Sequence, residues 1–320
     1  MKIVHCGNYD FLKYGKNFYC PDYKIHNGLV RNGWYVYPYS YRDEARKNIF
    51  ASKRFGIKRV NENLLRIVET VCPDLLLLGH SELISLQTLA AIKEKFDITV
   101  VMWWVDSLDE EKIGHIRERL PILDAFFTTT DEEYVRKRLQ TDFANIYYFP
   151  NICDDSLDRL KNFEKNNLRQ ELLYIGKIYE EKRTFFTKLQ HSILALHHFD
   201  SVYGARFYDT LAGFAYGLNY SKYNDIPKYS SDRIIYLTAN GLLTFCPRIP
   251  DFTSVFTEEE VLYFSTIEEL EELYQKALKD REWAMKIAYN GWRRAHEEYE
   301  TTKVMRWLVE RSFEAAKGNR

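Results

Sequence analysis

The sequence predicts an α/β protein with two domains, each built around a parallel β-sheet. A chain of 320 residues exceeds one typical domain, and its 46% hydrophobic residues can fill two cores. Short apolar segments alternate with segments that have the apolar spacing of helices, as in repeated βαβ units. This alternation stops at a polar, proline-containing segment, 150–155, and starts again after it.

Six apolar segments are the predicted strands of the first domain. Two of them, 75–78 and 100–104, are apolar throughout, as is typical of parallel strands with helices on both faces. Helical spacing in 61–72 and 85–95 predicts helices before and after segment 75–78. The predicted strands are 2–5, 35–39, 75–78, 99–104, 125–129 and 146–149.

The second domain is predicted to repeat this pattern. Its first elements are a strand at 172–176, a helix at 182–199 and a strand at 201–204. A later helix from Ser231 ends at Gly241, because glycine tolerates the left-handed conformation that terminates a helix, and an apolar strand follows. Ser265 and Glu268 have the spacing of a capping box, which predicts a helix over 266–279. We expect a first domain at 1–150, a linker at 151–170, a second domain at 171–300, and a closing helix with its tail at 301–320.

Composition and cysteine usage narrow the class of protein. A net charge of −1 is ordinary for a globular protein and favours no nucleic-acid partner. The five cysteines are odd in number and form no Cys-x-x-Cys pair, so we expect thiols in a reducing compartment and no zinc site. The apolar run after Met1 is too short for a signal peptide, and segment 98–105 is too short to cross a bilayer. We therefore expect a cytoplasmic protein.

The order of motifs in the last third of the chain resembles that of GT-B glycosyltransferases of the group-1 and spore-maturation (CgeB-like) types. The segments that carry the likeness are 231–241, the apolar run 242–245, 256–264, 265–270 and 287–291. The resemblance implies two Rossmann-like domains whose parallel sheets face each other across a cleft, with the last helix returning to the first domain. It also implies an acceptor site in the first domain and a nucleotide-sugar site in the second.

Residues that follow the predicted strands of the second domain are candidates for donor binding, because ligands of open α/β sheets bind at the carboxyl ends of the strands. Glycine lets a phosphate approach the backbone, and lysine or arginine neutralises a departing diphosphate. The candidates are Gly176, Lys177, Lys182, Arg183, Gly204, Arg206, Ser231, Arg233 and Gly241. Each cation taken alone is equally compatible with a surface or helix-capping role.

The first domain offers candidates for the acceptor side. His80 and Asp106 each follow a predicted strand, where a general base could remove a proton from an acceptor hydroxyl. The alternatives are a helix N-terminal residue bonded to the backbone for His80 and an N-cap for Asp106. By the resemblance, the loop after the first strand faces the acceptor, and its candidates are Asn8, Tyr9, Tyr14 and Gly15.

The chain departs from the family pattern at two positions. Retaining group-1 enzymes carry a Glu-x7-Glu pair before the Ala-x-Gly, and those positions hold Lys228 and Tyr236 here. The nearest remaining carboxylate, Asp232, could contact donor hydroxyls, attack the sugar as a nucleophile, or cap its helix. No Asp-x-Asp motif occurs in the sequence, so we expect neither a catalytic metal nor a cofactor apart from the nucleotide-sugar co-substrate.

These features favour transfer of a hexose or keto-acid sugar from a UDP-, GDP-, dTDP- or CMP-linked donor to a glycan or lipid-linked acceptor. The resemblance places such a reaction in bacterial surface-polysaccharide assembly, for lipopolysaccharide or capsule. One alternative is a catalytically degenerate GT-B protein that binds a sugar or a partner, and a second is a sugar-nucleotide epimerase. A NAD-dependent enzyme is disfavoured, because the first strand does not lead into a Gly-x-Gly-x-x-Gly turn.

A basic segment at 42–59 has seven basic and two acidic residues. A local excess of this size favours contact with an anionic membrane surface or a phosphorylated acceptor. The alternative is a solvated helix face.

Overall fold

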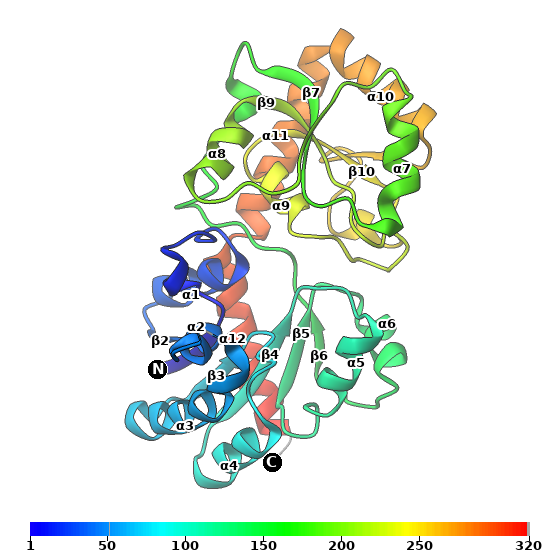
Figure 1. Ribbon diagram of the computed structural model, residues 1–320. Helices are drawn as coiled ribbons and strands as arrows, with labels where there is room; N and C mark the ends of the chain where they lie inside the picture. The colour runs from blue at the N-terminus through cyan, green and yellow to red at the C-terminus, as the bar shows by residue number, and fades with distance from the viewer. Residues whose placement is uncertain (51, 319–320) are drawn as a thin grey trace. The chain divides into compact units, whose positions relative to one another are not determined.

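The computed structural model describes residues 1–50 and 52–318 and shows two compact units, each with its own parallel sheet (Figure 1). Unit 1 comprises Met1–Phe149 and Thr301–Arg320, and unit 2 comprises Pro150–Glu300. The predicted α/β class with two parallel sheets is confirmed. The segment expected as a linker, 151–170, lies in unit 2, where Asp158 and Asn162 are fully buried.

The sheet of unit 1 has six parallel strands in the order β2-β1-β3-β4-β5-β6. Its strands are β1 (Lys2–Gly7), β2 (Tyr35–Ser40), β3 (Leu75–Leu78), β4 (Thr99–Trp104), β5 (Ala125–Thr128) and β6 (Ile146–Tyr148). All six predicted strands are confirmed, with differences of one or two residues at some ends. Every residue of β3 and β4 is buried, which explains why Thr99, at the start of β4, is the one hydroxyl-bearing position of these two strands.

The helices of unit 1 follow its strands along the chain. They are η1 (Phe11–Lys13), α1 (Pro21–Arg31), α2 (Tyr41–Arg46), α3 (Lys53–Val71), α4 (Leu86–Lys95), α5 (Glu110–Arg117), α6 (Glu132–Leu139) and the last helix, α12 (Thr301–Gly318). Helix α12 packs against α1, where a Cβ on Gly28 would lie 2.5 Å from Oγ1 of Thr301. The predicted return of the last helix to the first domain is therefore confirmed.

The sheet of unit 2 has five parallel strands in the order β11-β10-β9-β7-β8. The strands are β7 (Arg169–Ile175), β8 (Leu196–Phe199), β9 (Phe214–Leu218), β10 (Leu243–Pro247) and β11 (Leu262–Phe264). The remaining elements are η2 (Asn162–Glu164), α7 (Glu180–Gln190), α8 (Ala205–Ala212), α9 (Arg233–Thr238), η3 (Phe252–Ser254), α10 (Ile267–Lys279) and α11 (Arg281–Glu298). Phe186 of α7 and Leu270 of α10 belong to one core cluster with residues of β7, β9, β10 and β11.

Two element boundaries of unit 2 differ from those predicted. The helix predicted over 182–199 ends at Gln190, and the strand lies at Leu196–Phe199 and not at 201–204. Ser192 ends the helix locally, because its hydroxyl donates to the carbonyl of Leu189 and accepts from the N–H of Leu194. The predicted capping box is shifted by one residue: the N-cap is Thr266, and its side chain accepts from the N–H of Glu269.

Two further sequence expectations are tested by the described residues. None of the five cysteines is in a disulfide, in agreement with the sequence prediction. Within the described part of the chain, we find no helix with the length and apolar character needed to span a membrane.

Candidate active site

The sheet of unit 2 has a topological switch point between β7 and β9. Strand β8 lies on one side of β7, and the chain then crosses to the other side to form β9. The connections leave the carboxyl ends of these two strands in opposite directions, which opens a crevice where ligands of α/β proteins bind. Gly176 follows β7 and Asn219 follows β9 at this edge.

Arg233 links the ends of these two strands. Its Nε donates to the carbonyl of Ile175 (2.8 Å), and its Nη1 donates to the carbonyl of Tyr220 (3.1 Å) and to Oγ of Ser231 (3.0 Å). The guanidinium also lies over the ring of Tyr174, 4.4 Å from its centroid. Burial lowers the pKa of Arg233, but an arginine keeps its charge in proteins. The switch point of unit 2 therefore carries a fixed positive charge.

Gly176 leaves room for this arginine. Its φ is +149°, and a Cβ at this position would lie 2.4 Å from Nη2 of Arg233. A residue with a side chain would displace the guanidinium from the strand ends. Gly176 therefore allows the guanidinium of Arg233 to approach the end of β7 closely.

Lys182 adds a second buried cation to the same cluster. Its Nζ donates to the hydroxyl of Tyr174 (2.7 Å) and to the carbonyl of Lys177 (3.3 Å). Burial first, and the charge of Arg233 second, lower the pKa of Lys182 to about 7. The side chain of Lys177, by contrast, is exposed. Two like charges beside each other in a buried setting form a site that suits an anion.

The other predicted donor residues have different surroundings. Arg183 forms an exposed ion pair with Glu180 on α7 (2.6 Å). Gly204 has a φ of +64° and directly precedes α8, whose exposed Arg206 lines a cavity of about 510 Å³ beside Phe199. Gly241 ends the α9 segment with a φ of +75°, as predicted, and is packed against η2. The contacts therefore bring together Gly176, Lys182, Ser231 and Arg233 from the predicted set.

Asp232 and the two positions of the missing glutamates lie around α9. Asp232 occupies the N-cap position of α9 without a side-chain hydrogen bond to the helix, so the structure does not support the capping alternative. Tyr236 packs edge-to-face on Phe207, with ring centroids 5.0 Å apart. Lys228 has a φ of +56°, and its N–H donates to the carbonyl of Pro250.

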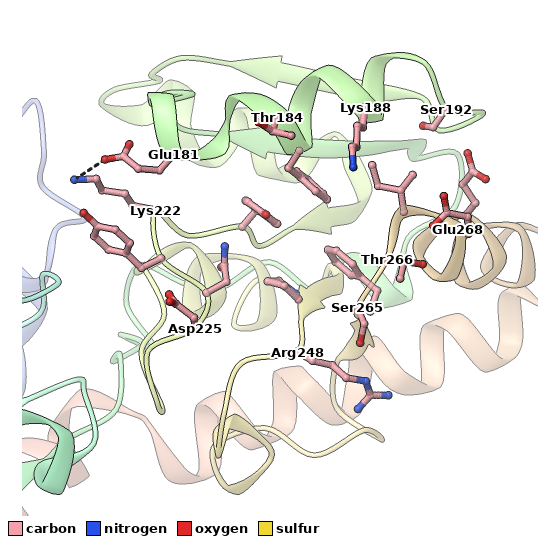
Figure 2. Close-up of a pocket in the computed structure, with 18 of the residues that line it drawn as sticks. Glu181, Thr184, Lys188, Ser192, Lys222, Asp225, Arg248, Ser265, Thr266 and Glu268 are labelled. Carbon is pink, nitrogen blue, oxygen red and sulfur yellow. Dashed lines mark ion pairs between the residues drawn. The ribbon is translucent and has the colours of Figure 1, made fainter.

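A cavity of about 1280 Å³ opens beside Tyr220, whose carbonyl binds Arg233 (Figure 2). Phe185 stacks on Tyr220, with ring centroids 3.8 Å apart and planes 8° from parallel, and Phe264 lies next to Phe185. Figure 2 shows residues of α7 on one side of the cavity and residues around the start of α10 on the other. Polar and charged residues line the rim: Glu181, Thr184, Lys188, Ser192, Lys222, Asp225, Arg248, Ser265, Thr266 and Glu268. Sequence reasoning missed this cavity.

His80 and Asp106 lie together at the carboxyl edge of the unit 1 sheet. Nδ1 of His80 is 3.7 Å from Oδ2 of Asp106, and Nζ of Lys112 is also 3.7 Å from that oxygen. The imidazole stacks on Trp104 with centroids 3.9 Å apart, and burial lowers the pKa of His80. Its Nε2 is buried and forms no hydrogen bond with any described residue. A neutral imidazole with one unpaired nitrogen and a carboxylate beside the other has the groups of a general base, and a hydroxyl reaches the buried Nε2 once a neighbouring side chain moves.

The alternative roles of these two residues find less support in the structure. The N-cap position of α5 is held by Asp109 and not by Asp106. The backbone carbonyl of His80 accepts a hydrogen bond from Nε2 of His115 (2.9 Å), but its own ring makes no backbone contact of this kind.

The predicted acceptor loop has a buried and an exposed part. The hydroxyl of Tyr9 is buried 2.6 Å from Nδ1 of His5, and the N–H of Asn8 donates to Asp22. Tyr14, in contrast, is 97% exposed and precedes Gly15, whose φ is +74°. Tyr9 and the backbone of Asn8 therefore stabilise the loop, and Tyr14 is open to solvent.

The described residues include one group of three potential metal ligands, which sequence spacing did not indicate. Cys153, Asp155 and His296 have ligand atoms within 4.8 Å of one another. Nδ1 of His296 lies 2.6 Å from Asp155, and its Nε2 lies 2.9 Å from the carbonyl of Ala239. Because both ring nitrogens have protein partners, we assign no metal to this group.

The comparison with family models gives a match in the unit that holds the cation cluster. Residues 159–310 match the family model described as glycosyl transferase-like. This region contains the switch point of unit 2 and extends into α12. No curated protein sequence matches the chain.

Solved structures match the fold over nearly the whole chain. Sucrose-phosphate synthase from Thermosynechococcus elongatus has a TM-score of 0.66 and 13% identity, covering 99% of this chain and 100% of the other. HepE of Anabaena, solved with UDP and glucose, has a TM-score of 0.58 and 10% identity, with 97% and 98% coverage. UDP-GlcNAc 2-epimerase from Neisseria meningitidis, bound to UDP-GlcNAc, has a TM-score of 0.54 and 12% identity, with 98% and 100% coverage.

These similarities establish the GT-B fold predicted from the motifs. At identities of 10–13% they establish the fold alone. Because an epimerase is among the similar structures, the chemistry has to be argued from the site.

Proposed function

We propose that the protein is a glycosyltransferase that moves a sugar from a nucleotide-activated donor to an acceptor hydroxyl. The observation that carries this proposal is the pair of cations, the buried Lys182 and the half-buried Arg233, at the switch point of the unit that matches the glycosyl transferase-like model. A transferase has to stabilise the negative charge that develops on its departing phosphate, and fixed cations in a buried site do this effectively.

On the donor side, the phosphates would lie against Lys182 and Arg233, with the exposed Lys177 adding a mobile charge. The cavity beside Tyr220 has the size and the aromatic surface to hold another part of the donor. Five further residues stay proposed on the donor side: Arg183, Gly204, Arg206, Ser231 and Gly241. Asp232 is proposed as a contact to the sugar hydroxyls or as a nucleophile.

On the acceptor side, His80 would act as the general base. In direct displacement, Nε2 of His80 takes the proton of the acceptor hydroxyl while its oxygen bonds to the anomeric carbon of the sugar. The bond from that carbon to the phosphate oxygen breaks, and the nucleotide leaves with the electron pair. Asp106 would stabilise the imidazolium that forms. Asn8, Tyr9, Tyr14 and Gly15 are proposed to frame the acceptor.

Finer features of the reaction follow from the resemblance. The proposal includes a UDP-, GDP-, dTDP- or CMP-linked hexose or keto-acid sugar, a glycan or lipid-linked acceptor, and a role in lipopolysaccharide or capsule assembly. It also includes the group-1 or CgeB-like subtype, a cytoplasmic location, and catalysis without a metal or a cofactor. UDP is the first nucleotide to test, because HepE was solved with UDP and glucose.

A binding screen with a matched variant tests the donor proposal. Thermal shift with UDP, GDP, dTDP, CMP and their sugar conjugates should raise the melting temperature for one nucleotide class, because a ligand of the folded state stabilises it. The K182M variant should lose most of that shift, whereas K286M, at an exposed lysine of α11 outside every proposed donor residue, should keep it. Equal shifts in both variants would contradict the assignment of the cation cluster.

An epimerase is the second candidate, because the UDP-GlcNAc 2-epimerase shares the fold. Incubation with the shifted sugar nucleotide distinguishes the two. An epimerase converts it to an isomeric sugar nucleotide without an acceptor, whereas a transferase releases nucleotide at a rate that rises when the acceptor is added. Binding without either reaction would support a catalytically degenerate protein.

A further inference from the structure

Unit 1 carries a group of exposed apolar side chains that pack against no core. Ile49 is 92% exposed, Phe50 and Phe55 are each 66% exposed, and Ile57 is 40% exposed. They lie in the connection between α2 and α3 and in the first two turns of α3, and the ring centroids of Phe50 and Phe55 are 5.2 Å apart. Clustered large apolar residues on a surface indicate an interaction site, unlike single ones. We call these four residues the apolar tip.

The connection that presents the apolar tip is internally hydrogen-bonded. Nδ2 of Asn48 donates to the carbonyls of Ala45 (2.7 Å) and Ser52 (2.8 Å), and its Oδ1 accepts from the N–H of Phe50 (3.1 Å). Helix α3 is held close to α2, since a Cβ on Gly56 would lie 2.0 Å from the carbonyl of Ala45. The hydrogen bonds of Asn48 therefore fix the backbone on which Phe50 is presented.

Basic residues surround the apolar tip. Lys47, Arg54 and Lys58 are exposed. The ion pair of Lys58 with Glu62 is open to solvent and therefore weak, and Lys47 pairs with the half-buried Glu44. Burial first, and then the charge of Arg42, lower the pKa of Lys53; Arg46 and Lys13 lower it further, while Glu82 opposes them. Positive charges from η1, α2 and α3 thus converge at this surface.

The acceptor loop adjoins this surface. The N–H of Phe11, the first residue of η1, donates to Oδ2 of Asp43 in α2 (2.7 Å). Phe11 and Leu12 are each nearly half exposed, and Tyr14 is almost fully exposed. Apolar and basic side chains therefore extend from the apolar tip to the loop at the carboxyl end of β1.

We propose that unit 1 docks on an anionic lipid bilayer through the apolar tip and its surrounding basic residues. Ile49, Phe50 and Phe55 enter the interface between headgroups and acyl chains, while Lys47, Arg54 and Lys58 contact the headgroup phosphates. A bilayer fits better than an acidic protein, because exposed apolar residues surrounded by basic ones match the acyl region and the anionic headgroups of a membrane at the same time. Docking stands on these residues alone and does not depend on the transferase reaction.

Vesicle co-sedimentation of the full chain tests the proposal. The chain should bind vesicles of phosphatidylcholine with about one third phosphatidylglycerol and bind pure phosphatidylcholine much more weakly, because about 1 kcal/mol per basic residue comes from anionic lipid. The F50S/F55S variant should lower the partition constant about tenfold or more, and K47E/K58E should remove the preference for anionic vesicles. Raising the salt concentration should weaken binding of the wild type.

The matched control is I193S, since Ile193 is 64% exposed, belongs to unit 2 and is not part of the apolar tip. It should bind vesicles as the wild type does, and I49S serves as a second test if F50S/F55S does not fold. The nucleotide-induced thermal shift should be unchanged in all of these variants, which separates docking from donor binding. Absence of wild-type binding to anionic vesicles, or equal losses in I49S and I193S, would overturn the proposal. A wild-type dimer that F50S/F55S converts to a monomer, without vesicle binding, would assign the surface to a second copy of the chain.

Discussion

Lys182 lies in an environment that is unfavourable for its own charge. Burial and the neighbouring guanidinium of Arg233 both favour the neutral amine, and the resulting pKa of Lys182 is about 7. An uncharged side chain of similar length, such as methionine, would occupy this buried site at a lower free-energy cost than a charged lysine. Stability and anion binding therefore make opposite demands on this residue, as is common at functional sites.

The K182M variant should be more stable than the wild type at pH 6 and should bind nucleotide less tightly. We expect a rise of a few degrees in melting temperature and a loss of about tenfold or more in affinity, because a charge-assisted bond to phosphate is removed. The pKa of Lys182 in the folded state is lower than its unfolded value of about 10.4. Below pH 7 the amine is charged in both states, so the wild type is destabilised there by the full amount that corresponds to this pKa difference. The stability difference should shrink as the pH rises from 7 toward 10. Thermal unfolding at several pH values and calorimetric titration measure both effects, and a variant that is less stable at every pH would contradict this account.

The protonation of His80 should determine how the reaction rate depends on pH. Burial lowers the pKa of His80, so its imidazole is neutral and able to accept a proton at neutral pH. The rate should stay constant through neutral pH and fall only below about 6.5, as the ring becomes protonated. H80Q should lower kcat about 10²-fold or more and remove the acidic limb of the pH profile, and D106N should lower kcat by less. An unchanged acidic limb in H80Q would assign it to another group.

At the scale of elements, the junction of β7, β9 and α9 depends on one glycine. Because a Cβ on Gly176 would lie 2.4 Å from Nη2 of Arg233, G176A should push the guanidinium away from the carbonyls of Ile175 and Tyr220. We expect G176A to lower the free energy of unfolding by about 1–3 kcal/mol, because overpacking and a positive φ act together. Nucleotide affinity should fall by a larger fraction than the stability does. Denaturant unfolding and calorimetric titration measure the two effects. G33A, at a φ of +82° with open space around it and outside the proposed sites, is the control for strain alone.

Some elements and contacts could be predicted from the sequence, and others have no local sequence pattern. Strands β3 and β4 were predictable because both of their faces are buried and every position after Thr99 in β4, and all of β3, is apolar. Strand β8 was missed because it lies at the edge of its sheet, and its Leu-His-His-Phe residues are all half-buried, which leaves no apolar signal. The partners of Arg233 are mostly backbone carbonyls, and the large cavity combines residues from α7, the segment after β9 and the start of α10. Neither arrangement has a local sequence pattern.

At the scale of the whole molecule, the chain enters unit 2 after Phe149 and leaves it before Thr301. The two ends of unit 2 lie beside each other, because the N–H of Cys153 donates to the carbonyl of Tyr299 (3.0 Å) and Cys153 pairs with Glu300 in a parallel bridge. Unit 2 is therefore one continuous segment with its own core, whereas unit 1 needs α12 from the far end of the chain.

Residues 150–300 should accordingly fold alone and bind the donor nucleotide, because Lys177, Lys182 and Arg233 and the cavity beside Tyr220 all lie within them. We expect one cooperative unfolding transition and a nucleotide affinity within about tenfold of the full chain. Residues 1–149 without α12 should be unstable, since the face of α1 around Gly28 loses Thr301 and its helix. Circular dichroism melts and calorimetric titration of both fragments check these expectations. A folded fragment 150–300 that binds no nucleotide, alongside a full chain that does, would show that unit 1 supplies residues to the donor site.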